Sequence, residues 1–190
     1  QAGWTNDSCT AYPALTCLAA SWSEEMSALY GKSIGEEARY REKDVLLGPG
    51  VNMYRSPLCG RNFEYMGEDP YLAGKLAVPY IHGLQSKGVG ACVKHYACNN
   101  EERHRHKTDV EVSERALREI YLPAFEMAVK EGGAWSMMAS YNLFRGTHCC
   151  HNGYLITDIL KGEWGFDGVV MSDWAGCHDT KEAVLGGLDV

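Results

Sequence analysis

Long hydrophobic runs and basic stripes are missing from this sequence of 190 residues. No stretch approaches the roughly 20 apolar residues that a membrane-spanning helix needs. The net charge is −7, and the only dense basic run is Arg-His-Arg-His-Lys at residues 103–107, which fits a solvated loop at least as well as a phosphate contact. We therefore expect neither a membrane segment nor a nucleic-acid partner.

Paired-cysteine and nucleotide-binding motifs are absent as well. The eight cysteines include no Cys-x-x-Cys pair, so metal ligation by cysteine is not expected. Several cysteines have apolar neighbours, which favours a reducing compartment such as the cytoplasm over a disulfide framework, while a periplasmic or secreted location stays open. No Gly-rich dinucleotide fingerprint or P-loop follows a predicted strand. We expect no metal and no cofactor.

What the chain does contain is a series of short apolar runs that end in polar, Gly or Pro residues. Continuous apolar strands of this kind are buried on both faces, as in parallel sheets. The runs occupy residues 45–52, 90–95, 135–142 and 168–172. Residues 14–20 predict an earlier strand, and residues 188–190 predict the start of a later one.

Helices with a 3.6-residue periodicity are predicted between these strands. Their capping residues are polar side chains of the kind that accept hydrogen bonds from the first helical turn: Ser23, Asp69, Ser113 and Asp179. Proline follows Asp69 at the first helical position. The predicted helices cover residues 23–41, 70–88, 113–132 and 179–186.

Strands that alternate with helices predict an α/β fold with a parallel sheet. An open doubly wound sheet and a (β/α)8 barrel both fit, and the barrel is preferred because functional-looking residues follow several different strands. A complete barrel has about 250 residues. We therefore expect one domain over residues 1–190, an incomplete (β/α)8 TIM-type barrel truncated at both ends.

A carboxylate and an indole close the apolar run at residues 168–172. Burying an anion costs several kcal/mol unless partners offset it, so Asp173 is a candidate for chemistry, although an aspartate after a strand can also serve only to cap a turn. Trp174 offers a flat apolar face that suits a sugar ring, or packing at the rim of a barrel.

Several long motifs lie in order over about residues 11–190. The segment at residues 60–70 reads Gly-Arg-Asn-Phe-Glu-Tyr-Met-Gly-Glu-Asp-Pro, and residues 113–123 read Ser-Glu-Arg-Ala-Leu-Arg-Glu-Ile-Tyr-Leu-Pro. Shorter motifs are Lys94-His95-Tyr96, Glu102 with Arg105, Ser140-Tyr141-Asn142 and Ser172-Asp173-Trp174. Together these motifs closely resemble glycoside hydrolase family 3, of the β-glucosidase type.

The resemblance implies a role for each matching residue. Asp173 corresponds to the nucleophile of a retaining mechanism, which needs a second carboxyl about 5 Å away as the proton donor. Residues corresponding to sugar contacts are Arg61, Lys94, His95, Arg105, Met138 and Trp174, and Tyr141 corresponds to a tyrosine that approaches the nucleophile. From residue type alone, plainer roles stay open: a buried ion pair for Lys94, a core histidine for His95, a surface salt bridge for Arg61 and core packing for Met138.

Two departures from the family pattern stand out. No Asp-Gly segment, which would supply a sugar-binding aspartate, precedes Thr5-Asn6-Asp7-Ser8. The general acid/base of such relatives belongs to a separate C-terminal α/β domain, which we expect as a missing partner. The carboxylates that remain match structural or binding positions, and none is assigned as the acid: Glu64, Glu68, Glu101 and Glu102.

The resemblance therefore implies a retaining β-glucosidase, which hydrolyses terminal non-reducing β-D-glucosyl residues of small glycosides or oligosaccharides through a covalent glycosyl-enzyme on Asp173. β-Xylosidase or α-L-arabinosidase activity of the same family is one alternative. An aldolase-type barrel with a Schiff base on Lys94 is another. A non-catalytic sugar-binding barrel is the third.

Overall fold

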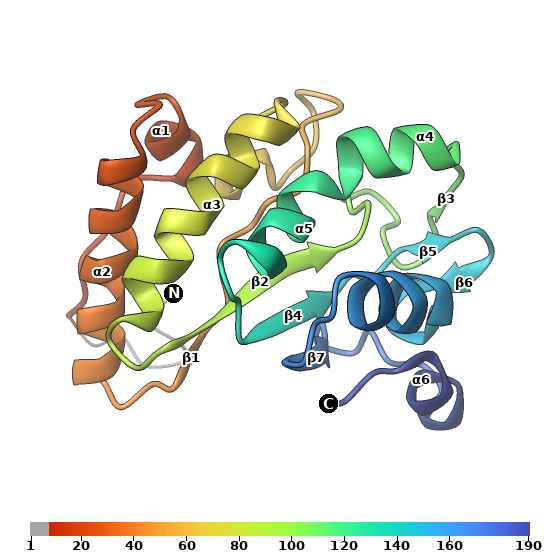
Figure 1. The fold of residues 1–190 in the computed structure, drawn as a ribbon. Coiled ribbons are helices and arrows are strands. Elements are labelled where there is room, and N and C mark those ends of the chain that lie inside the picture. Colours follow the sequence, from red (N-terminus) through yellow and green to blue (C-terminus); the bar gives the residue numbers. More distant parts are fainter. Residues whose placement is uncertain (1–7) are drawn as a thin grey trace.

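Four parallel strands form the main sheet of the computed structural model, which describes residues 8–190 (Figure 1). They lie in the order β1-β2-β4-β7, the same order in which they follow one another along the chain. A doubly wound sheet would reverse its strand order at a switch point, so this order is that of a partial (β/α)8 barrel. The strands are β1 (Val45–Leu46), β2 (Gly90–Tyr96), β4 (Ser136–Ala139) and β7 (Val169–Ser172).

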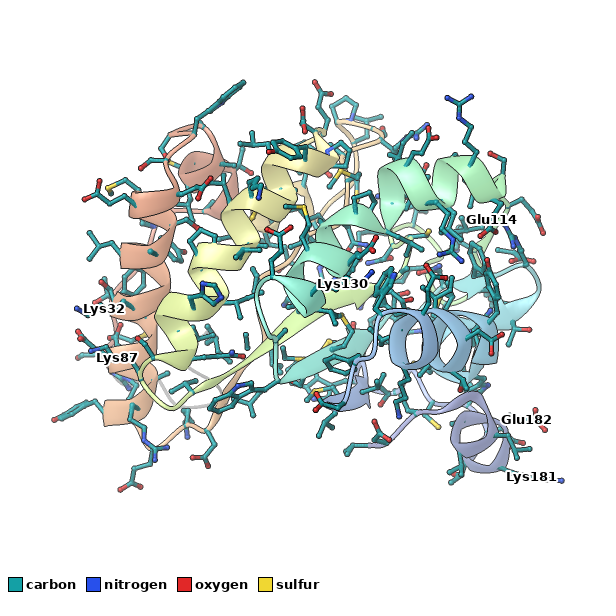
Figure 2. All side chains as sticks on the ribbon, viewed as in Figure 1. Lys32, Lys87, Glu114, Lys130, Lys181 and Glu182 are labelled. Atoms are coloured by element: carbon teal, nitrogen blue, oxygen red, sulfur yellow. The ribbon has the colours of Figure 1, made fainter. Side chains whose placement is uncertain are left out.

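The helices α2 (Glu24–Tyr40), α3 (Pro70–Gln85) and α5 (Pro123–Lys130) cover this sheet. Both α3 and α5 pack on β2, and α2 packs beside α3 (Figure 1). Their apolar faces and the strands beneath them form the core, which includes Leu76, Ile81, Leu84, Val93, Phe125 and Ala128. Charged side chains such as Lys32 and Lys181 project from opposite sides of the molecule (Figure 2).

Small residues allow α2 and α3 to approach closely. A Cβ atom added at Gly31 would lie 2.1 Å from the carbonyl oxygen of Tyr80, and one added at Gly83 would lie 2.2 Å from that of Ala28. The buried hydroxyl of Ser27 donates a hydrogen bond of 2.6 Å to the Leu76 carbonyl across the same contact. The two helix backbones are therefore in near contact, which only residues without large side chains permit.

The predicted helix starts are confirmed. The side chains of Ser23, Asp69, Ser113 and Asp179 each accept a hydrogen bond from a backbone N–H two or three residues further on. The last of them caps α6 (Thr180–Gly186), which ends before Gly187 in the left-handed conformation, with φ of 99°. Local side-chain chemistry thus defined these boundaries correctly.

The prediction of a strand at residues 14–20 was wrong, because this segment forms the helix α1 (Leu15–Ala19). The single helix predicted at residues 113–132 is also wrong. It divides into α4 (Glu114–Ala116), the π-helical turn η2 (Leu117–Tyr121) and α5. The division has a chemical cause, since Pro123 has no N–H to continue the ladder. The preceding residue instead donates across five residues, from Leu122 N to Leu117 O at 3.0 Å.

Residues 188–190, where the start of a later strand is predicted, pair with β7: Val190 N donates to Val170 O at 3.2 Å, and Ser172 N donates to Val190 O at 2.8 Å. The segments that follow β2 and β4 build a second, small sheet in the order β3-β5-β6. Its strands and the turns after them are β3 (Asp109–Val110), β5 (Leu143–Phe144), β6 (Thr147–His148), η3 (Cys149–His151) and the π-helix η4 (Tyr154–Glu163). One further short helix, η1 (Asn62–Glu64), lies in the segment between β1 and α3.

The cysteines are all free thiols, and each lies within residues 8–190. Within that same part of the chain, no helix has both the length and the apolar character needed to cross a membrane. The segment Thr5-Asn6-Asp7, where the sequence departs from the family pattern, lies outside the described residues.

Candidate active site

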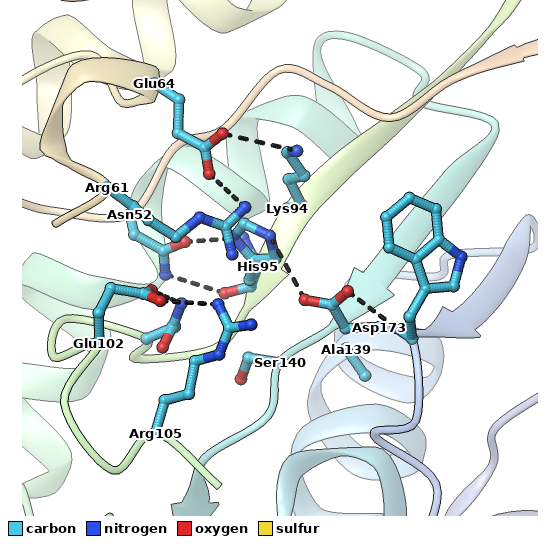
Figure 3. Close-up of polar contacts among 12 residues, drawn as sticks. Asn52, Arg61, Glu64, Lys94, His95, Glu102, Arg105, Ala139, Ser140 and Asp173 are labelled. Carbon is cyan, nitrogen blue, oxygen red and sulfur yellow. Dashed lines mark hydrogen bonds and ion pairs between the residues drawn. The ribbon is translucent and has the colours of Figure 1, made fainter. Parts of the chain in front are cut away.

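Polar side chains gather at the edge where the parallel strands end (Figure 3). Lys94 and His95 lie near the end of β2, and Asp173 directly follows β7. The loop before η1 contributes Arg61, and the long segment after β2 contributes Arg105. Carboxyl ends of parallel strands meet at one edge of a barrel, where active sites of this fold are assembled. The structure therefore brings together residues that are far apart in the sequence.

A register irregularity in β2 accompanies the placement of two consecutive residues in this site. The pairing of β2 with β4 shifts between Lys94 and Tyr96. In a regular strand neighbouring side chains point to opposite faces, whereas an irregularity of this kind re-aims one of them. Both Lys94 and His95 consequently reach the cluster of polar groups in Figure 3.

Asp173 is buried, with 5% of its surface exposed. Its backbone N–H donates to the Ala139 carbonyl at 3.1 Å, and its Oδ1 accepts a hydrogen bond of 2.8 Å from the Trp174 N–H. The other oxygen, Oδ2, lies 3.6 Å from His95 Nε2 and has no hydrogen-bond partner among the described residues. One carboxylate oxygen thus fixes the side chain, and the other is left available to a ligand.

His95 is buried and held from two sides. Asn52 clamps its backbone, accepting from His95 N at 2.7 Å and donating to His95 O at 2.9 Å. The ring nitrogen Nδ1 lies 2.9 Å from the hydroxyl of Tyr65. Burial, and secondarily the positive charges of Arg61 and Lys94, hold the pKa of His95 well below its usual range. The imidazole is therefore neutral at physiological pH, and its contact with Asp173 is not an ion pair.

Glu64 connects two of the cations. It forms an ion pair with Arg61, and its Oε2 lies 3.9 Å from the ammonium nitrogen of Lys94 (Figure 3). Burial lowers the pKa of Lys94, and the negative charge of Glu64 is the main influence in the opposite direction. The buried ion pair considered for Lys94 is therefore present, and the salt bridge considered for Arg61 is mostly buried rather than superficial.

Arg105 and Tyr141 form the other side of the site. The guanidinium carbon of Arg105 lies 4.3 Å from the centre of the Tyr141 ring, and Arg105 Nη1 donates to Glu102 Oε2 at 2.7 Å. Burial, followed by the nearby Asp173 carboxylate, raises the pKa of Tyr141 to about 12. Tyr141 consequently stays protonated and can act as a hydrogen-bond donor beside Asp173.

The remaining two predicted residues differ in exposure. Met138 in β4 is 4% exposed and pairs in register with Lys94, so it belongs to the buried floor next to the site. Trp174 is 66% exposed, and its indole is free to contact a ligand above Asp173. Rim packing within the described residues does not account for so exposed a ring.

The family follows from comparison with known proteins. Residues 2–184 match the N-terminal domain of glycosyl hydrolase family 3. The chain belongs to this family. A β-glucosidase of Bacteroides ovatus is 68% identical over all of this chain and 25% of its own length. A thermostable β-glucosidase B of Acetivibrio thermocellus and an exo-α-(1→6)-L-arabinopyranosidase of Bifidobacterium longum are each 49% identical, over 95% of this chain and 24% of their own.

Solved structures of family 3 proteins show the same fold. β-Glucosidase 3B from Thermotoga neapolitana, determined in complex with glucose, superimposes with a TM-score of 0.93 at 47% identity, covering 100% of this chain and 27% of the other. The expectation of an incomplete TIM-type barrel is thereby confirmed. This family 3 chain spans about a quarter of the length of the relatives it matches.

Sequence reasoning missed three polar residues that support this family 3 site. They are Asn52, Tyr65 and Asn99, of which Asn99 Nδ2 donates to Glu102 Oε1 at 3.0 Å and lies 3.5 Å from the Tyr65 hydroxyl. Asn52 ends the apolar run at residues 45–52, so its position after a strand was a usable signal. Nothing in the sequence marks Tyr65 as a partner of His95, or Asn99 as a partner of Tyr65 and Glu102, because both residues lie in loops.

Proposed function

We propose that this chain supplies the nucleophile and the sugar-binding cations of a retaining β-glucosidase. The observation that carries the proposal is the buried Asp173 carboxylate, whose Oδ2 accepts no hydrogen bond of normal length from the described residues and lies 3.6 Å from Nε2 of the neutral His95. A buried, unpartnered anionic oxygen is unfavourable for folding alone and is what nucleophilic attack requires. Names of relatives that are 47–68% identical support the same activity.

In the proposed reaction, Asp173 Oδ2 attacks the anomeric carbon and forms a glycosyl ester while the glycosidic C–O bond breaks. A carboxylic acid outside this chain protonates the leaving oxygen and then, as a carboxylate, removes a proton from the water that hydrolyses the ester. Asp173 leaves as a carboxylate, and the product retains its anomeric configuration. Glu64 and Glu102 are not the acid in this scheme, because each is committed to a cation.

Binding of the sugar is proposed to rest on three charged donors and on the neutral His95. Arg61, Lys94, His95 and Arg105 surround the space next to Asp173 Oδ2, and such donors discriminate strongly against ligands that leave them unpaired (Figure 3). Trp174 would stack on the apolar face of the ring. Tyr141, protonated and beside Asp173, would orient the nucleophile by donating a hydrogen bond. Met138 would complete the apolar floor of the subsite.

α-L-Arabinopyranosidase activity is the second candidate, and the name of one relative supports it. The Bifidobacterium longum enzyme of that name matches this chain at 49% identity, the same value as the thermostable β-glucosidase. L-Arabinopyranose lacks the hydroxymethyl group of glucose and carries its 4-hydroxyl in the opposite configuration, so the selectivity depends on the room for the hydroxymethyl group and on the contacts of the 4-hydroxyl. Aryl glucosides, xylosides and arabinopyranosides assayed side by side with the full-length protein distinguish these activities.

The two non-glycosidase alternatives have less support. A Schiff base on Lys94 needs an amine that is free to attack, whereas Lys94 is paired with Glu64. Borohydride trapping with a carbonyl substrate tests that role. A sugar-binding barrel without turnover would not need Oδ2 of Asp173 to remain unpartnered.

Replacing the nucleophile tests the proposal directly. Asp173→Ala in the full-length protein should lower kcat by about 10⁴-fold or more, because the covalent step has no substitute. Added azide should restore part of the rate and give a glycosyl azide of inverted configuration. A variant that keeps substantial retaining activity without azide would show that another group is the nucleophile.

A further inference from the structure

A row of buried polar groups lies behind His95 and ends at Glu102. Oε1 of Glu102 accepts from Asn99 Nδ2 at 3.0 Å, and that nitrogen also lies 3.5 Å from the hydroxyl oxygen of Tyr65. The same hydroxyl lies 2.9 Å from His95 Nδ1. On the far side of the imidazole ring, Nε2 lies 3.6 Å from Asp173 Oδ2. The row thus connects a carboxylate bound to Arg105 with the proposed nucleophile.

The chemistry of these groups fixes the direction of each hydrogen bond. An ionised carboxylate only accepts, so Asn99 must turn its NH2 group toward Glu102. The same NH2 group faces Tyr65, whose oxygen therefore accepts there. A phenol has one hydrogen to donate, and the remaining partner of the Tyr65 hydroxyl is His95 Nδ1. The hydroxyl of Tyr65 consequently donates to Nδ1.

A nitrogen that accepts cannot itself carry a hydrogen. Burial of the ring keeps the pKa of His95 low, so the imidazole has a single N–H, and burial keeps the pKa of Tyr65 above its usual value, so its hydroxyl stays protonated. With Nδ1 accepting from Tyr65, that N–H is on Nε2. It faces Asp173 Oδ2 and the space beside it.

We propose that Tyr65 is a positioning residue that holds His95 in the tautomer with its hydrogen on Nε2, with Asn99 and Glu102 fixing the direction of the Tyr65 hydrogen bond. This inference rests on the proposed glycosidase function for its catalytic meaning. While Asp173 is ionised, both its carboxylate and the Tyr65 hydroxyl favour the His95 tautomer with hydrogen on Nε2. Once Asp173 carries the glycosyl ester its charge is gone, and Tyr65 alone keeps His95 as a donor to the sugar.

The first test measures the tautomer itself and does not depend on activity. Full-length protein with ¹⁵N-labelled histidine is compared by NMR with the His95→Gln variant, whose missing signals identify those of His95. We expect Nδ1 to have the chemical shift of an unprotonated nitrogen and Nε2 that of an N–H. In Tyr65→Phe, the Nδ1–H tautomer should gain population. The matched control is Tyr96→Phe, which removes a buried hydroxyl bonded to the Leu155 carbonyl and should leave His95 unchanged.

The second test asks whether the tautomer matters for turnover. Losing one oriented hydrogen bond predicts that Tyr65→Phe lowers kcat/KM for an aryl β-glucoside about tenfold, and Tyr96→Phe should leave it unchanged. A glutamine at position 95 offers an amide N–H without any tautomer. In the His95→Gln background, adding Tyr65→Phe should therefore cause little further loss, whereas a merely structural role would give the same tenfold loss in both backgrounds.

The outcomes separate the two proposals. A protonated Nδ1 in the unmodified protein, or a Tyr65→Phe variant with unchanged NMR signals of His95, overturns the role of Tyr65 whatever the activity. Equal losses in the two backgrounds overturn it as well. If the NMR results are as expected and the full-length protein hydrolyses no glycoside, the positioning of His95 stands, and the proposed glucosidase function fails instead.

Discussion

Glu64→Gln in the full-length protein removes one negative charge and almost no volume. The change leaves Arg61 and Lys94 without the carboxylate that now lies between them. Unit charges about 4 Å apart interact by about 4 kcal/mol at an effective dielectric constant of about 20. The glutamine oxygen still accepts a hydrogen bond, so part of this interaction survives. We expect kcat/KM to fall about 10-fold to 100-fold, which corresponds to about 1.4 to 2.8 kcal/mol.

The pH dependence of this variant gives a sharper readout. Burial lowers the pKa of Lys94, and Glu64 is the main group that raises it. Without the negative charge, burial and the charge of Arg61 lower the pKa further, so the ammonium loses its proton at a lower pH. If the charged form binds the sugar, the alkaline limb of the kcat/KM profile must move toward lower pH. Rates with an aryl β-glucoside across the pH range measure this shift.

Glu68→Gln is the matched control, because Glu68 lies on the same segment and is exposed to solvent. It removes the same charge and should change neither kcat/KM nor the alkaline limb. An alkaline limb that stays in place in Glu64→Gln, or that moves equally in both variants, would refute the role assigned to Glu64.

Three further outcomes are expected of the full-length protein. Lys94→Ala and His95→Ala should each lower kcat/KM more than they raise KM. Removing the contacted hydroxyl from the glucoside should then lower kcat/KM less in the variant than in the wild type. Equal decreases in both enzymes would exclude that contact. Gly31→Ala should destabilise the barrel by about 1–3 kcal/mol through its clash with Tyr80, while Gly153→Ala, whose nearest neighbouring atom is 3.8 Å away, serves as the control in thermal unfolding. Burial lowers the pKa of both His95 and His151 in the folded protein, so these histidines bind protons more readily in the unfolded state. The thermal midpoint of unfolding should therefore fall as the pH drops below about 6.5. A midpoint that rises would contradict this prediction.

The sequence predicted correctly those features that depend on interactions between residues close together in the chain. Ser23 and Asp69 start helices because a side-chain oxygen next to a free N–H is a short-range interaction, and the place of Asp173 follows from its position after a buried strand. The strand predicted at residues 14–20 is a helix, because an apolar run this short fits a strand or a helix equally well. Pro123 is a visible signal for the division of the helix at residues 113–132, because a proline inside a helical pattern cannot donate to the hydrogen-bond ladder.

Partnerships across the fold could not be predicted. Tyr65 and His95 are 30 residues apart, and their hydrogen bond depends on how the loop before α3 folds over β2. The carboxylates illustrate the same limit, since sequence alone did not show which of them would pair with a cation. Such contacts depend on the tertiary structure, and residue type and spacing alone do not tell which two residues meet in it.

The distribution of charge explains how one carboxylate among several would be free to react in the proposed mechanism. Glu64 is committed to Arg61 and Lys94, and Glu102 is committed to Arg105. Asp173 faces a neutral His95, so no described cation forms an ion pair with its Oδ2. A salt-bridged carboxylate would have to break that contact before attacking carbon, and its electron density would be less available. The paired cations can still bond to sugar hydroxyls through their remaining N–H groups. In the proposed reaction, binding and attack thus fall to different groups, which is why we expect the charge on Glu64 to matter for a reaction in which Glu64 takes no part.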